Sequence, residues 1–281
     1  MKRRLLAGVL TLVMMLSLLP TVAWARNDEG IDADSVENDV VTSGPITIWT
    51  GKIVQITVPE GDAVSSSNTD IVSVEKNGTA VTLTGGSKEE RAEVTAGEST
   101  WVVYNYASEA EHNYLYSLFH GKTISVMGDS ISTIKDKIPS GNALYYDNTT
   151  GKEMTFERNY WGDIITRFGA VEGIDEAWSG STIGSKAASM ASKDRINKLD
   201  DNGTPDVILY YGGSNPDSSV GTFDPDADYA KTVDWAKSYS DTASAYAASL
   251  QRMKATYPGA EIIAIIPYYC LLYTSDAADD K

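Results

Sequence analysis

The sequence predicts two domains: a small all-β domain, and then a larger α/β domain built on a parallel sheet. Short alternating apolar runs separated by turn signals fill residues 46–106, which is the pattern of antiparallel strands. After Gly121 the pattern changes to continuous apolar runs, such as DVILYY at 206–211, separated by amphipathic segments. Strands and helices that alternate in this way favour a parallel sheet covered on both faces and joined by right-handed crossovers.

The chain begins with the pattern of a secretory signal. Lys2, Arg3 and Arg4 precede the apolar run 5–19, and Ala23-Trp24-Ala25 has the small-x-small spacing of a cleavage site. We therefore expect residues 1–25 to be a signal peptide, with an N-terminal membrane anchor as the alternative. The apolar stretch is short for a membrane span. Either reading places the rest of the protein outside the cytoplasm, secreted or at the cell surface.

Charge and cysteine content exclude several classes of protein. The 39 acidic residues outnumber the 23 basic ones, which gives a net charge of −16. Such a field repels nucleic acid and anionic membrane surfaces, and its simplest role is solubility. The single cysteine, Cys270, cannot form an internal disulfide. No Cys/His cluster has the spacing of metal ligands, so we predict no metal site and no cofactor.

Residues 26–44 are acidic, polar and without apolar periodicity, so we expect a flexible leader. Residues 45–106 contain the expected strand runs ITIW, IVQITV, IVSVE, AVTLT, AEVTA and TWVVYNY, and Asn77-Gly78 predicts a tight hairpin. The stretch SSNTDIVSVEKNGTAVTLTG, residues 66–85, resembles the bacterial Ig-like domains. That resemblance implies an Ig-like β-sandwich, which acts either as a spacer or as a contact for cell wall or glycan.

Residues 107–120 predict a short linker helix with its apolar residues on one face. It contains both histidines of the chain, His112 and His120. Neither has a carboxylate or cysteine at a spacing that would orient it as a base, so we interpret both as linker or surface residues. The remaining elements are expected in chain order: strand 123–127, helix 159–170, a strand ending at 177–178, helix 185–199, strand 206–211, helix 241–257 and strand 261–267.

Three residues follow the ends of consecutive strands of the predicted parallel sheet, where ligands bind in such folds. Ser130 comes after Gly128-Asp129 and presents a hydroxyl, although a helix N-cap is the alternative. Gly180 can offer its N–H to a ligand, or be an ordinary loop glycine. Asn215 can donate to an oxyanion, or be an ordinary turn asparagine. Together they supply the parts that acyl transfer needs.

These three segments carry a resemblance to a known family. GDSIS at 128–132, WSGSTIG at 178–184 and PDVILYYGGSN at 205–215 resemble the SGNH hydrolases, also called the GDSL esterase/lipase family. The resemblance extends over about residues 121–267 and implies a flavodoxin-like, three-layer α/β/α domain, which we place at residues 121–269.

By the same resemblance, Ser130 is the nucleophile. The oxyanion hole is then formed by the N–H groups of Ser130 and Gly180 together with the side chain of Asn215.

Two departures from the family pattern stand out. Pro216 separates Asn215 from Asp217, whereas the family commonly has Asp directly after this Asn. The Asp-x-x-His block, which in the family follows the last strand, has no counterpart here. The ending CLLYTSDAADDK, residues 270–281, resembles a translated adapter sequence, so we expect an incomplete hydrolase domain. A genuine polar tail is the alternative.

The sequence therefore predicts a secreted serine esterase that acts on an acylated small molecule or polysaccharide, with carbohydrate deacetylation as the specific expectation. Without the Asp/His block we expect the chain as given to be inactive. The alternative is a non-catalytic surface protein that binds carbohydrate or mediates adhesion. Trp161 and one of Tyr210 and Tyr211 are expected in the core, while the orientation of Tyr145 and Tyr146 is open.

Overall fold

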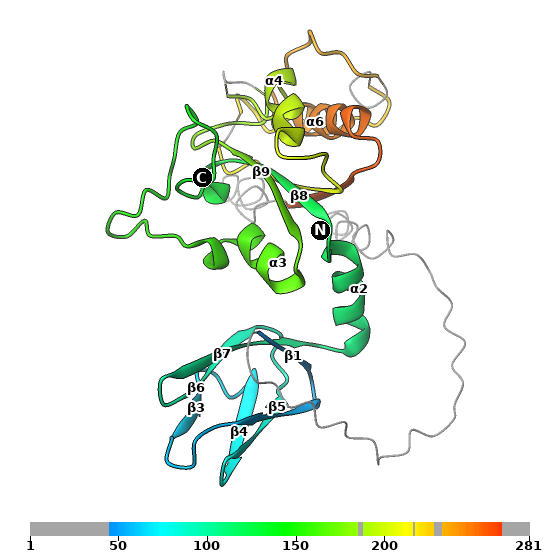
Figure 1. Cartoon of the computed structure of the whole chain (residues 1–281). Coiled ribbons are helices and arrows are strands. Elements are labelled where there is room, and N and C mark those ends of the chain that lie inside the picture. The colour runs from blue at the N-terminus through cyan, green and yellow to red at the C-terminus, as the bar shows by residue number, and fades with distance from the viewer. Residues whose placement is uncertain (1–44, 185–187, 216, 228–231, 266–281) are drawn as a thin grey trace, which may run out of the picture. The chain divides into compact units, whose positions relative to one another are not determined.

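A computed structural model describes residues 45–184, 188–215, 217–227 and 232–265 (Figure 1). The predicted signal peptide, the leader and the segment 270–281 lie outside these residues. Within the described part of the chain, no helix is long and apolar enough to cross a membrane.

The N-terminal part is all-β, as the alternating runs predict. Its strands form two sheets, ordered β1-β7-β6-β3 and β2-β5-β4. The strands are β1 (Ile46–Trp49), β2 (Ile53–Thr57), β3 (Val64–Ser66), β4 (Val72–Asn77), β5 (Ala80–Gly85), β6 (Arg91–Ala96) and β7 (Ser99–Tyr106). Neighbours pair antiparallel except β1 and β7, which are parallel. The sequence analysis missed β3, because its residues VSS carry too little apolar pattern.

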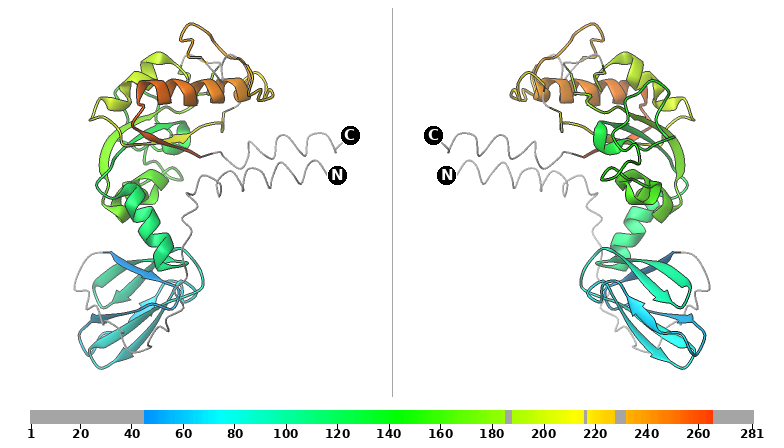
Figure 2. Two further views of the ribbon diagram at one scale, coloured as in Figure 1. Left: turned by 90° about the vertical axis from the view of Figure 1, so that its right-hand side faces the viewer. Right: turned by 90° about the vertical axis from the view of Figure 1, so that its left-hand side faces the viewer.

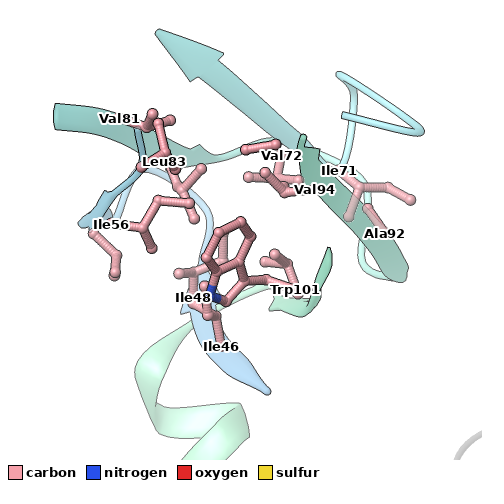
Figure 3. Close-up of a cluster of buried hydrophobic side chains, with 14 residues drawn as sticks. Ile46, Ile48, Ile56, Ile71, Val72, Val81, Leu83, Ala92, Val94 and Trp101 are labelled. Carbon is pink, nitrogen blue, oxygen red and sulfur yellow. The ribbon is translucent and has the colours of Figure 1, made fainter. Parts of the chain in front are cut away.

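One buried cluster unites the two sheets of this domain. Ile48 and Trp101 come from one sheet and Ile56 and Leu83 from the other, and their side chains converge in Figure 3. The predicted hairpin is also present, since Asn77 pairs with Ala80 across β4 and β5. The loop is Gly78-Thr79, one residue later than expected, with Gly78 at φ 62°. Glycine at the first central position fits the strand twist of a tight hairpin.

The second part is an α/β domain whose described residues form four parallel strands. They are β8 (Thr123–Gly128), β9 (Val171–Ala177), β10 (Val207–Tyr211) and β11 (Glu261–Ile265). Their order across the sheet is β11-β10-β8-β9, and each neighbouring pair is parallel. If these strands are numbered 1 to 4 along the chain, the order read from β9 to β11 is 2-1-3-4. The flavodoxin-like order 2-1-3-4-5 begins in the same way. The predicted parallel sheet is confirmed, and its topological switch point lies between β8 and β10.

Helices cover both faces of this sheet (Figures 1 and 2). On one face, α3 (Tyr160–Phe168) packs its Trp161 against a cluster that includes Val126 and Leu209. On the other, α6 (Thr242–Thr256) packs against a cluster that includes Met127 and Tyr210. Adjacent strand residues thus point to opposite layers, as the period of a strand requires. The remaining helical elements among the described residues are α2 (Glu109–Phe119), α4 (Lys193–Ile196), and the 3₁₀ turns η1 (Ser130–Ser132), η2 (Phe156–Arg158) and η3 (Asn197–Asp200).

The predicted helix 185–199 is largely wrong. Only α4 and the turn η3 are helical there, residues 185–187 lie outside the described part, and 188–192 form an irregular segment. The Ser189 hydroxyl donates to the Ile183 carbonyl and accepts from the Ala191 N–H. Ser192 caps the N-terminus of α4. Serine side chains that bond to nearby backbone compete with helical hydrogen bonds, so the helix begins only after Ser192.

Candidate active site

The carboxyl ends of three neighbouring strands lie at one level of the sheet. Gly128 at the end of β8 is in register with Tyr211 of β10 and with Ala177 of β9. Ser130, Gly180 and Asn215 follow these three residues within a few positions of the chain. The structure therefore brings the segments that carry the three predicted residues to the same edge, on both sides of the switch point where ligands bind.

Ser130 is the first residue of η1, and its hydroxyl is free of the capping role that was the alternative. The N-cap is Asp129, whose buried carboxylate accepts from the Ile131 N–H at 3.1 Å. Its second oxygen accepts from the Ser214 N–H at 3.3 Å, which ties the end of β10 to the serine turn. Burial raises the pKa of Asp129, although these N–H donors oppose the shift. Ser130 is half-buried, and its hydroxyl makes no hydrogen bond with the described residues.

Donor groups at this edge are unused. Within the described residues, the N–H groups of Ser130 and Gly180 donate to no acceptor. Gly180 has φ 81°, a backbone conformation that suits glycine. The Asn215 amide donates one hydrogen to the Ser181 carbonyl at 2.9 Å, which leaves its second hydrogen available. The unused donors could therefore bind a group that accepts hydrogen bonds, such as an oxyanion.

Hydrogen bonds hold together the segments that follow the strand ends. The Gly128 carbonyl accepts from the Trp178 N–H at 3.1 Å, which joins the ends of β8 and β9. Pro216 lies outside the described residues, but Asp217 is buried and accepts from the Gly184 N–H at 3.1 Å. Asp217 therefore links the segment that follows β10 to the segment that follows β9.

A buried ion pair lies beneath the site. Arg195 donates to the Gly128 carbonyl at 3.0 Å and to the Glu176 backbone carbonyl. Its Nε lies 3.4 Å from the carboxylate of Glu176, and both side chains are almost fully buried. Burial lowers the pKa of Arg195, while Glu176 opposes that shift. The sequence analysis missed this pair because SKDRINKL has the composition of a solvent-facing helix. The available signal was Glu176, the acidic residue directly before Ala177-Trp178 at the predicted strand end.

The buried carboxyl of Asp175, next to Glu176 in the chain, should make the stability of the folded protein depend on pH. Burial raises its pKa well above the ordinary value, helped by Glu176 and opposed by the Ala177 N–H and by Arg195. Because the folded state holds this proton more tightly than the unfolded state, its contribution to stability falls as pH rises above about 4. An Asp175→Asn variant removes this loss. We expect its melting temperature relative to the parent to rise between pH 4 and pH 7.

The control for that measurement is Asp136→Asn, which changes an exposed aspartate. Asp136 has φ 67°, a conformation that asparagine also tolerates. Its melting temperature relative to the parent over the same pH range is the reference for Asp175→Asn. If the two variants change alike with pH, the Asp175 carboxyl ionises normally in the folded protein.

Neither histidine lies near Ser130. His120 is exposed, stacks on Tyr116 with ring centroids 4.1 Å apart, and has its Nδ1 2.8 Å from the Phe168 carbonyl oxygen. It precedes β8, whereas Ser130 follows it, and a strand of this length spans about 20 Å. His112 lies further back, on α2. These positions agree with the interpretation of both as linker residues.

Aromatic side chains gather near the serine turn. Tyr145 and Tyr146 pack edge to face, with centroids 4.9 Å apart, and the Tyr145 N–H donates to Thr133. Burial raises the pKa of Tyr146, and Tyr145, Tyr211 and Asp129 add to the shift. Trp161 and Tyr210 are in the core, as predicted, while Tyr211 is half-buried. The sequence had left the direction of Tyr145 and Tyr146 open.

The fold and this edge define a parallel α/β protein with a serine and unused N–H donors at its switch point, the arrangement of a serine-dependent hydrolase. Residues 122–269 match the family model for GDSL-like lipase/acylhydrolase. The chain belongs to this family, as the sequence motifs predicted. Membership of this family supports the interpretation of the α/β domain as an ester-hydrolysing enzyme.

Solved structures give weaker likenesses. A GDSL-like lipase from Bacteroides ovatus is 22% identical, with 56% of this chain and 79% of that chain covered and a TM-score of 0.44. A GDSL-like lipase from Bacteroides uniformis is 26% identical, with 52% and 71% covered and a TM-score of 0.42. Comparison with curated proteins found no match. Membership of the family therefore rests on the sequence match.

Proposed function

We propose that the α/β domain cleaves acyl esters through an acyl-serine intermediate on Ser130. The observation that carries this proposal is the set of unused donors on Ser130, Gly180 and Asn215, which follow strand ends at one level of the sheet. Donors arranged in this way stabilise the negative charge that develops on a carbonyl oxygen under attack.

The proposed reaction has two halves. The Ser130 oxygen bonds to the acyl carbon as its proton passes to a base, the ester C–O bond breaks, and the alcohol leaves with a proton. Water then attacks the acyl-serine, releases the carboxylic acid and restores the hydroxyl. The oxyanion in each half accepts hydrogen bonds from the Ser130 and Gly180 N–H groups and from the Asn215 amide.

The base in this reaction is neither histidine of the chain, because both lie away from Ser130. We therefore propose that the 281-residue chain is nearly inert and gains activity when an Asp-x-x-His block from a family member is joined after residue 269. The domain before it is proposed to be an Ig-like spacer or glycan contact. A secreted deacetylase of carbohydrates fits the signal-like N-terminus and the acidic composition.

Labelling with a fluorophosphonate tests the proposal on the extended chain. We expect stoichiometric labelling that is lost in Ser130→Ala and kept in Ser140→Ala, an exposed serine of the loop after η1. Labelling that survives Ser130→Ala would place the nucleophile elsewhere. A folded extended chain that takes no label would favour the non-catalytic surface protein.

A further inference from the structure

A pocket lies on the helical face of the α/β domain that carries α4 and α6. Its volume is about 500 Å³, and basic and aromatic side chains line it. Arg252 comes from α6, Lys193 from α4, and Lys237 from the segment that precedes α6. Three cations around one pocket contrast with the net charge of −16 of the whole chain.

Arg252 is the fixed element of this pocket. The residue is 4% exposed, and its guanidinium donates to the carbonyls of Ala191 at 2.6 Å, Asp234, and Lys237 at 2.8 Å. These bonds use three of its five N–H groups. No carboxylate of the described residues forms an ion pair with it. The hydrogen bonds of this guanidinium thus go to neutral carbonyls, while the Asp234 carboxylate acts on it only electrostatically, so N–H donors remain for an anionic partner.

Aromatic rings hold the cations in place. The Arg252 guanidinium lies 5.3 Å from the ring centre of Trp235 and 5.6 Å from that of Tyr239. The Lys237 ammonium lies 5.3 Å from the Tyr239 ring, and the Lys193 ammonium 6.0 Å from the Trp235 ring. Cation–π contacts of this kind orient a positive charge without neutralising it. Both lysines are exposed, so a ligand can reach them.

We propose that this pocket binds an oxyanion group, a carboxylate, sulfate or phosphate, carried by a small molecule or a glycan. Arg252 forms the buried floor, where its remaining N–H groups donate to the anion, and the exposed Lys193 and Lys237 that line the pocket add positive charge. Charge-assisted hydrogen bonds to a guanidinium that is already ordered cost little conformational entropy. The proposal is independent of ester hydrolysis, because it uses none of the residues assigned to that reaction.

Isothermal titration of the full chain tests the site, with sulfate, phosphate, glucuronate and glucose as probes. Low ionic strength is needed, since about 0.1 M salt screens charges beyond roughly 10 Å. We expect saturable binding of at least one anion and none of glucose. Lys193→Gln and Lys237→Gln should each weaken it roughly three- to tenfold, because each removes one charge that faces the anion. Both positions are exposed, so these variants fold as the parent does.

The matched control is Lys122→Gln, an exposed lysine directly before β8, at the sheet edge opposite the strand ends. It removes the same charge and should leave the affinity unchanged. Binding of glucuronate alone identifies a carboxylate ligand, and binding of sulfate or phosphate alone identifies a sulfated or phosphorylated one. The proposal is overturned if no anion binds saturably, if glucose binds as tightly, or if Lys122→Gln weakens binding as much as the pocket variants do.

Discussion

Alanine at position 130 is expected to lower kcat/KM for p-nitrophenyl acetate by about 10⁴-fold or more in the chain extended with an Asp-x-x-His block. The hydroxyl is the only proposed bond-forming group, while the oxyanion donors on Gly180 and Asn215 remain. The variant should therefore keep a small residual rate and an unchanged fold. The measurement is the initial rate of nitrophenolate release, compared at equal concentrations of parent and variant.

The same assay on the 281-residue chain measures how much of the rate depends on the added general base. We expect a rate about 10³-fold or more below that of the extended chain, since a serine without a general base is a poor nucleophile. Equal activity in the two chains would falsify the proposed need for the added block. A Ser130→Ala variant as active as its extended parent would remove this serine from the mechanism.

Replacing Arg195 with methionine is expected to reduce the free energy of unfolding by about 3–5 kcal/mol. The change leaves the Glu176 carboxylate buried without its partner and takes a donor from the Gly128 carbonyl. Because Gly128 lies two residues before Ser130, the variant should also lower kcat of the extended enzyme. Urea denaturation followed by fluorescence measures the stability.

Two comparisons make this result specific. Lys137→Met breaks the partly exposed ion pair with Glu172 and should cost less than about 1 kcal/mol. The double variant Arg195→Met/Glu176→Gln should recover part of the loss, because no uncompensated charge remains buried. If Arg195→Met unfolds at the same urea concentration as the parent, the pair does not brace the strand ends.

The sequence predicted the sheet well for a physical reason. Strands buried on both faces need continuous apolar runs, and DVILYY is such a run: Val207, Ile208, Leu209 and Tyr210 are all buried in β10. The run EIIAIIP likewise predicted β11, which is partly buried along Ile262–Ile265. The candidate site followed from this, because residues just past consecutive parallel strands meet at one edge. Ser130, Gly180 and Asn215 could thus be selected before any coordinates were known, although their roles in catalysis stay predictions.

Other features depend on tertiary contacts that no local pattern encodes. SKAASMASKDRINKL has good helix formers, yet its serines bond to the backbone and α4 keeps only residues 193–196. Arg195 and Arg252 look solvent-facing in their segments, but backbone carbonyls far along the chain receive their N–H groups. Buried arginines of this kind are visible only when the acceptors have been positioned by the fold.

A crystal structure of the extended chain with a fluorophosphonate bound to Ser130 tests the central claim most directly. We predict that the phosphoryl oxygen lies within about 3.2 Å of three nitrogens: the backbone N of Ser130, the backbone N of Gly180 and Nδ2 of Asn215. An adduct whose phosphoryl oxygen points into solvent, with Gly180 and Asn215 out of hydrogen-bond reach, would contradict the account.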